Sequence, residues 1–401
     1  MAAIFNRFLP LYITLLFALS LASGKSFDYQ GVNIPGLEFR IDTNGAVSCA
    51  GCQPTYPSLD NLDSWLGLNA TLIRIPVGWN YLQPNKFPTN ALDPTIMGHL
   101  DELVQHITFN QKRKVYVVID IHNYARYNKV IVGQEKARPF NYDLGVLWQL
   151  LAEHYKNNSQ VMFGLMNEPH DLDIKIWAQT VQFVINQIRQ VTTAQYILVP
   201  GTSWQALVGW TTESQNALSI VTDPAGKIYY DVHQYFDGNG GNNGYCNDFN
   251  STFRNDFRDF ASAMRSTRSK AILSEFGGNS TDLKCRTTVN DMLLFLENNA
   301  DAFAGWTAWG TGLDTTERTF LDPANALRPT PSLENVIAAH MNMAVEGSDN
   351  VAMATAVELL TVVDEDVEVI GVEEAIGACE LGLGAGAGSN MASTQYGISV
   401  T

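Results

Sequence analysis

Two glutamates follow short apolar stretches of the sequence. Val161–Met166 is almost uniformly apolar and runs directly into the tripeptide N-E-P, whose carboxylate is Glu168. Ala271–Gly278, with the sequence AILSEFGG, repeats the pattern with Glu275. An apolar run of this length is typical of a strand buried on both faces, and a proline ends such a strand. We therefore expect both carboxylates at the C-terminal ends of two buried parallel strands, on the same rim of a sheet.

A pair of facing carboxyl groups is what the cleavage of a glycosidic bond requires. One group protonates the leaving oxygen, while the other, ionised, attacks the sugar or activates a water molecule. Separations of about 5–5.5 Å are typical of retaining enzymes and about 6.5–9.5 Å of inverting ones. The two roles require different pKa values, which burial and neighbouring charges supply. The pattern predicts such a site if the fold brings the two strand ends together.

Further apolar stretches recur along residues 25–341, separated by segments long enough for a helix. The candidate strands are Gly31–Ile34, Thr71–Val77, Val115–Ile121, Val161–Met166, Tyr196–Pro200, Ile228–His233, Ala271–Glu275 and Phe303–Trp309. The candidate helices are Ile96–Asn110, Leu144–Asn157, Ile174–Thr192, Phe253–Arg268 and Val289–Asn299. Eight strands alternating with helices predict an α/β fold, a (β/α)8 TIM barrel over residues 25–341. A doubly wound open sheet is the alternative, but GVNIPG after residue 30 is not the G-x-G-x-x-G turn typical of it.

In a TIM barrel the functional side chains come from the C-terminal ends of several strands. Polar and aromatic residues stand at or just beyond these ends: Arg74, Trp79, His122, Asn123, Tyr124, Asn167, Trp204, His233, Tyr235 and Trp309. Taken singly, an Arg or a His at a strand end is more often structural than catalytic. Their joint placement indicates a site in which an Arg and a Tyr hydroxyl keep one carboxylate ionised. Indoles there would pack against the apolar face of a sugar ring.

Several motifs resemble those of one known family. LIRIPVGWNYL, VIDIHNYARYN, FGLMNEPHD, DVHQYFD, AILSEFGG and AWGTGLD are similar to glycoside hydrolase family 5 (cellulase family A) and, within it, to the fungal endo-β-1,4-glucanases of subfamily 5. The resemblance covers about residues 27–340 and implies a retaining double displacement, with Glu168 as general acid/base and Glu275 as nucleophile.

The resemblance also implies roles for the supporting residues. Arg74 and Tyr235 match residues that hold the nucleophile, and Trp309 matches the platform of the −1 sugar. His122, Asn167 and His233 match positions that orient the carboxylates or bind that sugar. We predict Trp79, Tyr124 and Trp204 at other sugar subsites. No cofactor and no metal is expected, since His122 and His233 lie on different strands without a spaced ligand partner.

The expected substrate is β-1,4-glucan, cleaved at internal bonds. An endo-β-1,4-mannanase or a mixed-linkage glucanase acting through the same site is an open alternative. A non-catalytic carbohydrate-binding barrel is a remote one, because such a protein is expected to have lost a carboxylate and both are present. Tyr127 stands where a Trp often follows N-Y-A-R in the family, so the residues do not single out one polysaccharide.

The N-terminus has the features of a secretory signal peptide. Arg7 supplies the positive charge and Leu11–Leu21 the apolar segment, which is too short to span a bilayer comfortably. We expect cleavage after about residue 22 and an extracellular protein with no membrane contact. Export permits disulfides and N-glycans. A Cys246–Cys285 bridge is expected, the pairing of Cys49 and Cys52 is left open, and the sequons lie at Asn69, Asn157, Asn250 and Asn279.

The net charge of −16 is concentrated at the C-terminus. The last 61 residues contain ten acidic residues and no Lys or Arg, together with a Gly/Ala-rich run and Cys379, the expected unpaired cysteine. We predict a disordered tail over residues 342–401, because it lacks large apolar side chains for a second core. The acidic balance argues against nucleic acid as a partner. A monomer that binds polysaccharide is expected.

Overall fold

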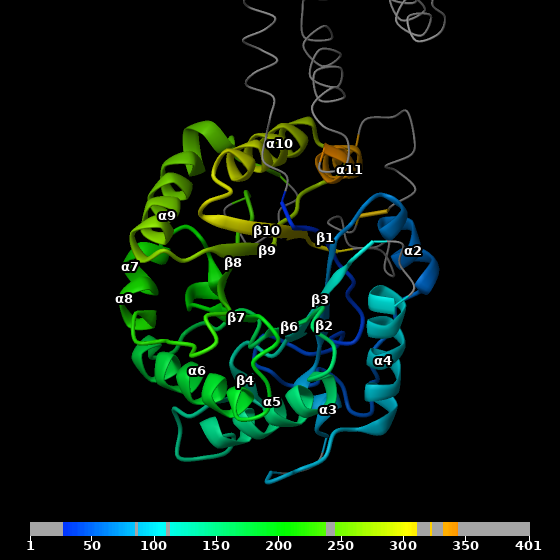
Figure 1. The fold of residues 1–401 in the computed structure, drawn as a ribbon, viewed down its shortest axis with the longest axis vertical. Helices are drawn as coiled ribbons and strands as arrows, with labels where there is room; N and C mark the ends of the chain where they lie inside the picture. Colours follow the sequence, from blue (N-terminus) through cyan, green and yellow to red (C-terminus); the bar gives the residue numbers. More distant parts are fainter. Residues whose placement is uncertain are drawn as a thin grey trace, which may run out of the picture. The chain divides into compact units, whose positions relative to one another are not determined.

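Eight parallel strands close into a barrel surrounded by helices (Figure 1). The computed structural model describes residues 27–84, 87–109, 113–237, 245–310, 321–322 and 332–343. The strands are β1 Tyr29–Asn33, β2 Leu72–Val77, β3 Tyr116–Ile121, β6 Val161–Gly164, β7 Ile197–Pro200, β8 Ile228–His233, β9 Ala271–Glu275 and β10 Phe303–Ala308. They follow one another around the barrel in chain order, and β1 pairs with β10. This closure confirms the predicted (β/α)8 fold and excludes the open sheet.

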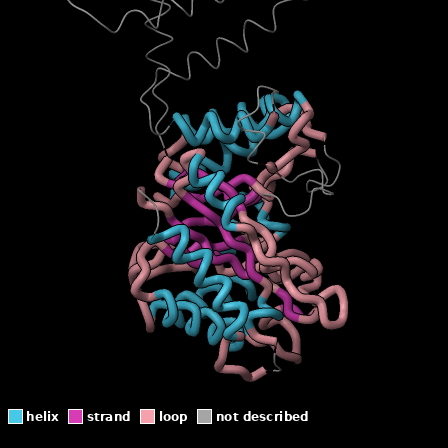
Figure 2. Tube along the Cα trace, turned by 90° about the vertical axis from the view of Figure 1, so that its right-hand side faces the viewer, coloured by secondary structure: helices cyan, strands magenta, loops and turns pink. Residues whose placement is uncertain are grey.

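The helices lie outside the strands, as the side view shows (Figure 2). The longer ones are α2 Leu59–Gly67, α4 Pro94–Phe109, α5 Asn141–Tyr155, α6 Ile174–Arg189, α9 Arg254–Thr267, α10 Leu283–Asn298 and α11 Leu333–Met343. The shorter elements are α3 Trp79–Leu82, η1 Ser203–Gln205, α7 Trp210–Glu213, α8 Gln215–Leu218, η2 Phe249–Phe253 and the hairpin β4 Arg126–Tyr127 with β5 Val130–Ile131.

The five predicted helices are all present, with shifted ends. The largest shift is at α10, which begins at Leu283 rather than Val289 because Asp282 caps it, accepting from the Cys285 amide at 2.8 Å. The signals for α2 and α11 were missed. Between β7 and β8 the chain forms three short helices, η1, α7 and α8, and no long helix.

The inside of the barrel changes from apolar to polar along the strands. One end is filled by an apolar cluster: Tyr29, Leu72, Val118, Met162, Leu198, Ile272 and Ala304. Side chains two residues apart on a strand share a face. Arg74 and Asp120 therefore stand directly beyond Leu72 and Val118, and both are fully buried. The apolar end closes the barrel, while the C-terminal ends of the strands carry the charged groups.

Two disulfides hold loops on the described part of the chain. Cys246–Cys285 joins the segment after β8 to the first turn of α10, as predicted. Cys49–Cys52 closes a small loop between β1 and α2. The predicted signal peptide, the acidic tail and Cys379 lie outside the described residues. None of the helices within the described ranges combines the length and apolarity needed to cross a membrane.

Candidate active site

Glu275 ends β9 at an irregularity in the barrel. Val232 of β8 pairs with Leu273, but the next residue, His233, pairs with Glu275, so the register shifts by one. Ser274 and Glu275 consequently both reach His233, with Ser274 Oγ 3.1 Å from Nε2 and Glu275 Oε2 3.6 Å from Nδ1. Such bulges commonly redirect a side chain beside an active site. Here the bulge turns the Glu275 carboxylate into the polar end of the barrel.

The Glu275 carboxylate is buried and has two donors. Arg74 Nη1 donates to Oε2 at 3.1 Å, and the Tyr235 hydroxyl donates to Oε1 at 2.9 Å. Arg74 is itself fixed by Asn33, Asn167 and Asp120 at 2.7, 2.7 and 3.0 Å. Burial raises the pKa of Glu275, while the Arg74 charge and the Tyr235 hydrogen bond oppose that rise. These two donors favour the ionised form of this carboxyl group.

Glu168 stands beyond the end of β6, on a loop. Its φ is 45°, in the left-handed region that only a few per cent of non-glycine residues adopt. Its Oε1 lies 2.9 Å from His233 Nδ1, and its amide donates to the Gln205 side-chain oxygen. The pKa of Glu168 is raised well above its usual range, first by burial and then by the negative charge of Glu275. This carboxyl group is therefore held in its protonated form to higher pH than an ordinary glutamate.

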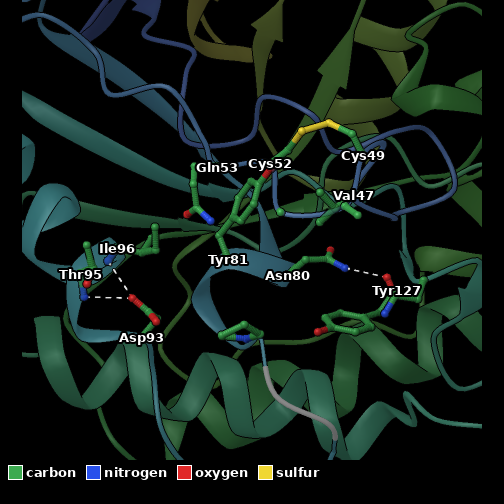
Figure 3. Close-up of a pocket in the computed structure, with 14 residues that line it drawn as sticks. Val47, Cys49, Cys52, Gln53, Asn80, Tyr81, Asp93, Thr95, Ile96 and Tyr127 are labelled. Carbon is green, nitrogen blue, oxygen red and sulfur yellow. Dashed lines mark hydrogen bonds between the residues drawn. A yellow bond between two sulfur atoms is a disulfide. The ribbon is translucent and has the colours of Figure 1, made fainter.

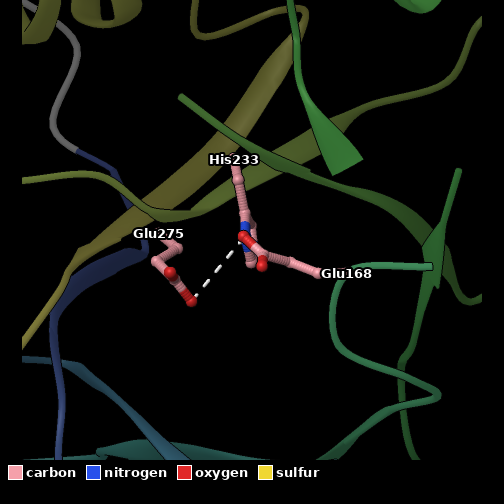
Figure 4. A group of neighbouring side chains, drawn as sticks. All are labelled: Glu168, His233 and Glu275. Atoms are coloured by element: carbon pink, nitrogen blue, oxygen red, sulfur yellow. Dashed lines mark hydrogen bonds and ion pairs between the residues drawn. The ribbon is translucent and has the colours of Figure 1, made fainter. Parts of the chain in front are cut away.

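The two carboxyl groups face each other across His233 (Figure 4). One oxygen of Glu168, one of Glu275 and a His233 nitrogen all lie within 4.8 Å of one another. The pKa of Glu168 is raised well above its usual range by burial and by the Glu275 charge, whereas Glu275 is paired with the Arg74 guanidinium. The arrangement can donate a proton from one side of a bond and attack from the other.

Both histidines of the site can be assigned a protonation state from their neighbours. Arg74 has only donors, so Asn167 turns its oxygen to Arg74 and donates its Nδ2 to His122 Nε2 at 3.1 Å. His122 therefore carries its proton on Nδ1, 3.0 Å from Asp120 Oδ2. Burial, with the positive charge of Arg74, lowers the pKa of His233 well below its usual range. His233 is neutral, and the Ser274 hydroxyl, which both donates and accepts, fits either of its tautomers.

Aromatic rings border the carboxyl groups. Trp309, just after β10, is half-buried and lies nearly parallel to the His122 ring, 5.6 Å away. Trp204 is 40% exposed and stacks on His170 with centroids 3.7 Å apart. Tyr124 lies 6.1 Å from Trp204, and its pKa is raised well above its usual range by burial and by both glutamates. These rings offer flat apolar faces beside the carboxyl pair.

The prediction of Trp79 at a sugar subsite is wrong, because its indole is fully buried. Trp79 begins α3 two residues after β2, and its ring packs against Phe87 and Tyr127 while Nε1 donates to Gln83 at 2.8 Å. Asn123 is also fully buried, and its Oδ1 accepts from the Trp79 amide at 2.7 Å. Both residues fix the loops after β2 and β3, so their support for the site is indirect.

Four residues of the site were missed from the sequence: Asn33, Asp120, Gln205 and Ser274. Asp120 had a detectable signal, since it precedes His122 by two residues and must share its face of β3. Asn33 had a similar one, at the end of β1. Ser274 becomes part of the site only through the bulge, and Gln205 only through the turn that follows β7.

Glu168, His233 and Glu275 are close enough together to bind one cation. All three already contact one another or the side chains of Ser274, Arg74 and Tyr235.

A separate groove of about 530 Å³ lies beside the Cys49–Cys52 loop and is bordered by Asn80, Tyr81 and Tyr127 (Figure 3). Neither glutamate lines it. The chemistry indicated by the charged groups therefore belongs to the barrel end.

Known proteins share this barrel. The profile of the family described as cellulase (glycosyl hydrolase family 5) matches residues 28–312, which include both glutamates. Endoglucanase 1 of Saitozyma flava is 36% identical over 308 residues, covering 75% of this chain and 84% of that protein. The crystal structure of Cel5A (EG2) from Hypocrea jecorina is 33% identical with a TM-score of 0.67, covering 78% of this chain and 98% of that one. XacCel5A in complex with cellopentaose is 27% identical with a TM-score of 0.68, covering 78% and 99%.

Proposed function

This chain belongs to glycosyl hydrolase family 5 and is a glycoside hydrolase, and from that premise we propose that it is a secreted, retaining endo-β-1,4-glucanase. The observation that carries the proposal is the pair of carboxyl groups in unlike surroundings, with oxygens within 4.8 Å of each other. This proximity supports a retaining mechanism, for which carboxyl separations of roughly 5–5.5 Å are typical, over an inverting one, for which they are roughly 6.5–9.5 Å.

In the first step the Glu275 carboxylate attacks the anomeric carbon of the sugar. The bond from that carbon to the leaving oxygen breaks, and the oxygen takes the bond's electron pair together with the proton of Glu168. Arg74 and Tyr235 keep Glu275 ionised until the attack. Burial and the charge of Glu275 keep Glu168 protonated. The products are a glycosyl ester on Glu275 and a shortened chain with a free hydroxyl.

In the second step Glu168, now ionised, accepts a proton from a water molecule. The water oxygen attacks the anomeric carbon from the side that the leaving chain has vacated, and the ester bond to Glu275 breaks. Both carboxyl groups return to their starting forms. Two inversions at the same carbon leave the product with the configuration of the substrate. His233 remains neutral and hydrogen bonded to Glu168 in both protonation states of that carboxyl group.

β-1,4-Glucan is the proposed substrate. The matched proteins carry the names endoglucanase and Cel5A, and one of the matched structures contains cellopentaose. Trp309 is half-buried and Trp204 is 40% exposed, and indole rings of this kind are suited to packing against the apolar faces of sugar rings. Reducing-sugar release should be larger on carboxymethylcellulose than on mannan or on barley mixed-linkage glucan. A clear preference for mannan would overturn the proposed substrate but not the proposed double displacement.

The double displacement has its own test. Proton NMR of cellopentaose hydrolysis should show the β-anomer of the new reducing end first, before mutarotation. An α-anomer appearing first would overturn the retaining mechanism. Dialysis against EDTA should leave turnover unchanged, because the proposed steps use no metal.

Secretion is supported by the N-terminal sequence and by the two disulfides of the described region. Expression in a secreting host should yield a protein that begins near residue 23, which N-terminal sequencing of the medium would detect. Gel filtration of that protein should give the mass of a monomer. Retention of residues 1–22 in the mature protein would contradict the proposed cleavage.

A further inference from the structure

Three consecutive residues after β7 have left-handed backbone angles. Ser203, Trp204 and Gln205 have φ values of 54°, 61° and 56°, and none of them is glycine. Each such residue is strained, and a run of three persists only where the surroundings hold it. We call residues 203–205 the left-handed turn. The contacts on its two sides show what holds it and what it holds in return.

On one side the left-handed turn is bound to the segment that carries Glu168. The Gln205 side-chain oxygen accepts from the Glu168 amide. The Trp204 amide donates to the Pro169 carbonyl at 3.1 Å. The Trp204 ring stacks on His170 with an interplanar angle of 5°. Three successive residues, from Glu168 to His170, are therefore each held by this turn.

On its other side the left-handed turn is bound to β8, next to the hydrogen-bond partner of Glu168. Gln205 Nε2 donates to the Asp231 carbonyl at 3.4 Å. Ala206 forms a parallel bridge with His233, and the Leu207 amide donates to the His233 carbonyl at 2.9 Å. The Gln205 amide thus spans the gap between the backbone of Glu168 and the strand that bears His233.

Gln205 is fully buried, so water does not replace it as a partner. A buried amide N–H without an acceptor is costly, and Glu168 also has the strained φ of 45°. Loss of the Gln205 oxygen therefore leaves the Glu168 backbone free to relax away from this conformation. Its carboxyl group would then no longer be fixed toward His233 and the scissile oxygen.

We propose that Gln205 is a positioning residue for the proton donor: its side-chain amide holds the Glu168 backbone in the conformation from which the carboxyl group reaches the leaving oxygen. The inference rests on the proposed role of Glu168 as general acid/base. It goes further because it assigns the positioning of the proton donor to a residue that does not itself contact the sugar.

The test compares Gln205→Met with the wild type on two substrates. Methionine has a similar length but no acceptor oxygen. Cellopentaose has an alcohol leaving group that must be protonated, whereas 2,4-dinitrophenyl β-cellobioside releases a phenolate that needs no proton. We expect kcat on cellopentaose to fall by about 10- to 100-fold. The rate of the pre-steady-state dinitrophenolate burst should stay within about threefold of wild type, because that step needs no acid catalysis.

Two further variants separate positioning from folding. Ser203→Ala lies in the same turn but changes no contact to Glu168, and it should match wild type on both substrates. Gln205→Glu should recover turnover in acid, where its protonated carboxyl group can accept from the Glu168 amide and donate to the Asp231 carbonyl. Its activity should fall as the pH rises and the introduced group ionises beside Glu168. Burst amplitude counts the folded, active sites in every variant.

Equal losses on both substrates, or no loss on cellopentaose, would overturn the inference. Glu168→Gln is measured in parallel. If Glu168→Gln shows the difference between the two substrates and Gln205→Met does not, only the positioning role fails. If Glu168→Gln loses both substrates equally, the acid/base assignment itself fails, and the inference fails with it.

Discussion

The two carboxyl groups of the site are held by different kinds of structure. Glu275 belongs to β9 and receives direct hydrogen bonds from Arg74 and Tyr235, and Arg74 is itself fixed by Asn33, Asn167 and Asp120. Glu168 lies beyond β6 on a left-handed residue, and its backbone is held by a side chain from another loop. The strand-borne group is fixed by charge, whereas the loop-borne group is fixed by backbone contacts.

This difference matches the chemistry that each group is proposed to perform. A nucleophile must be ionised and must point at one atom. A position on a rigid strand, with direct hydrogen bonds from a guanidinium and a hydroxyl, meets both needs. A group that releases and regains a proton in every cycle cannot be paired with a fixed charge, because the charge would favour one form. Glu168 accordingly has a neutral imidazole as its partner.

Replacing the strand-borne group should have the largest effect. Glu275→Gln removes the attacking oxygen, and we expect kcat to fall on the order of 10⁴- to 10⁶-fold on every substrate, whatever its leaving group. Stopped-flow and steady-state assays on cellopentaose and on the dinitrophenyl cellobioside would measure it. Melting temperature serves as the control for folding. A burst of dinitrophenolate from this variant would show that Glu275 is not the nucleophile.

Replacing the loop-borne group should have a smaller and more selective effect. Glu168→Gln should lower kcat on cellopentaose by about 10²- to 10⁴-fold, the usual contribution of general acid–base catalysis. Its burst with dinitrophenyl cellobioside should survive, while the following hydrolysis of the ester becomes slow. Added azide, which needs no general base, should speed that second step and yield a glycosyl azide detectable by mass spectrometry. No effect of azide would contradict the assignment.

Weakening the charge control of Glu275 should shift its titration. Tyr235→Phe removes the hydrogen bond to Oε1, which stabilises the ionised form, so the pKa of Glu275 should rise. Activity requires that form, and the acidic limb of the kcat/KM profile should therefore move to higher pH. Because this is a hydrogen bond to a charged group, its loss should also lower kcat/KM near the pH optimum, by about 10- to 150-fold. An unmoved acidic limb would show that this hydroxyl does not control Glu275.

Replacing Trp204 or Trp79 should affect the chemical step least. The first replacement should weaken substrate binding, whereas the second should lower stability. Trp204 is exposed and Trp79 is fully buried. Trp204→Ala should raise KM for cellopentaose by about 2- to 12-fold at nearly unchanged melting temperature. Trp79→Ala should lower the free energy of unfolding by about 3–5 kcal/mol, measured by urea titration. A KM effect of Trp79→Phe without loss of stability would restore Trp79 as a sugar contact.

Both carboxylates and the barrel could be predicted because apolar strands and their ends are local features of the sequence. Arg74 was predicted at a strand end, but it lies in the middle of β2 and reaches the site because it shares the inward face of Leu72. The rule failed for Trp79, because a residue two positions past a strand can turn inward or outward, and α3 turns it into the core. The β9 bulge and the left-handed turn depend on pairing between distant segments, so Ser274 and Gln205 had no local signal.

The Cys246–Cys285 bridge acts on only one half of this site. It joins the segment that follows Tyr235 to the helix that follows Glu275, and its two sulfurs lie 3.0 Å from where a side chain at Gly278 would begin. The bridge links these two segments covalently, and a side chain at Gly278 would meet both sulfurs. The opposite half, from Glu168 to Trp204, depends only on non-covalent contacts. Substitutions are therefore expected to be tolerated better in the loops of that second half than at Gly278.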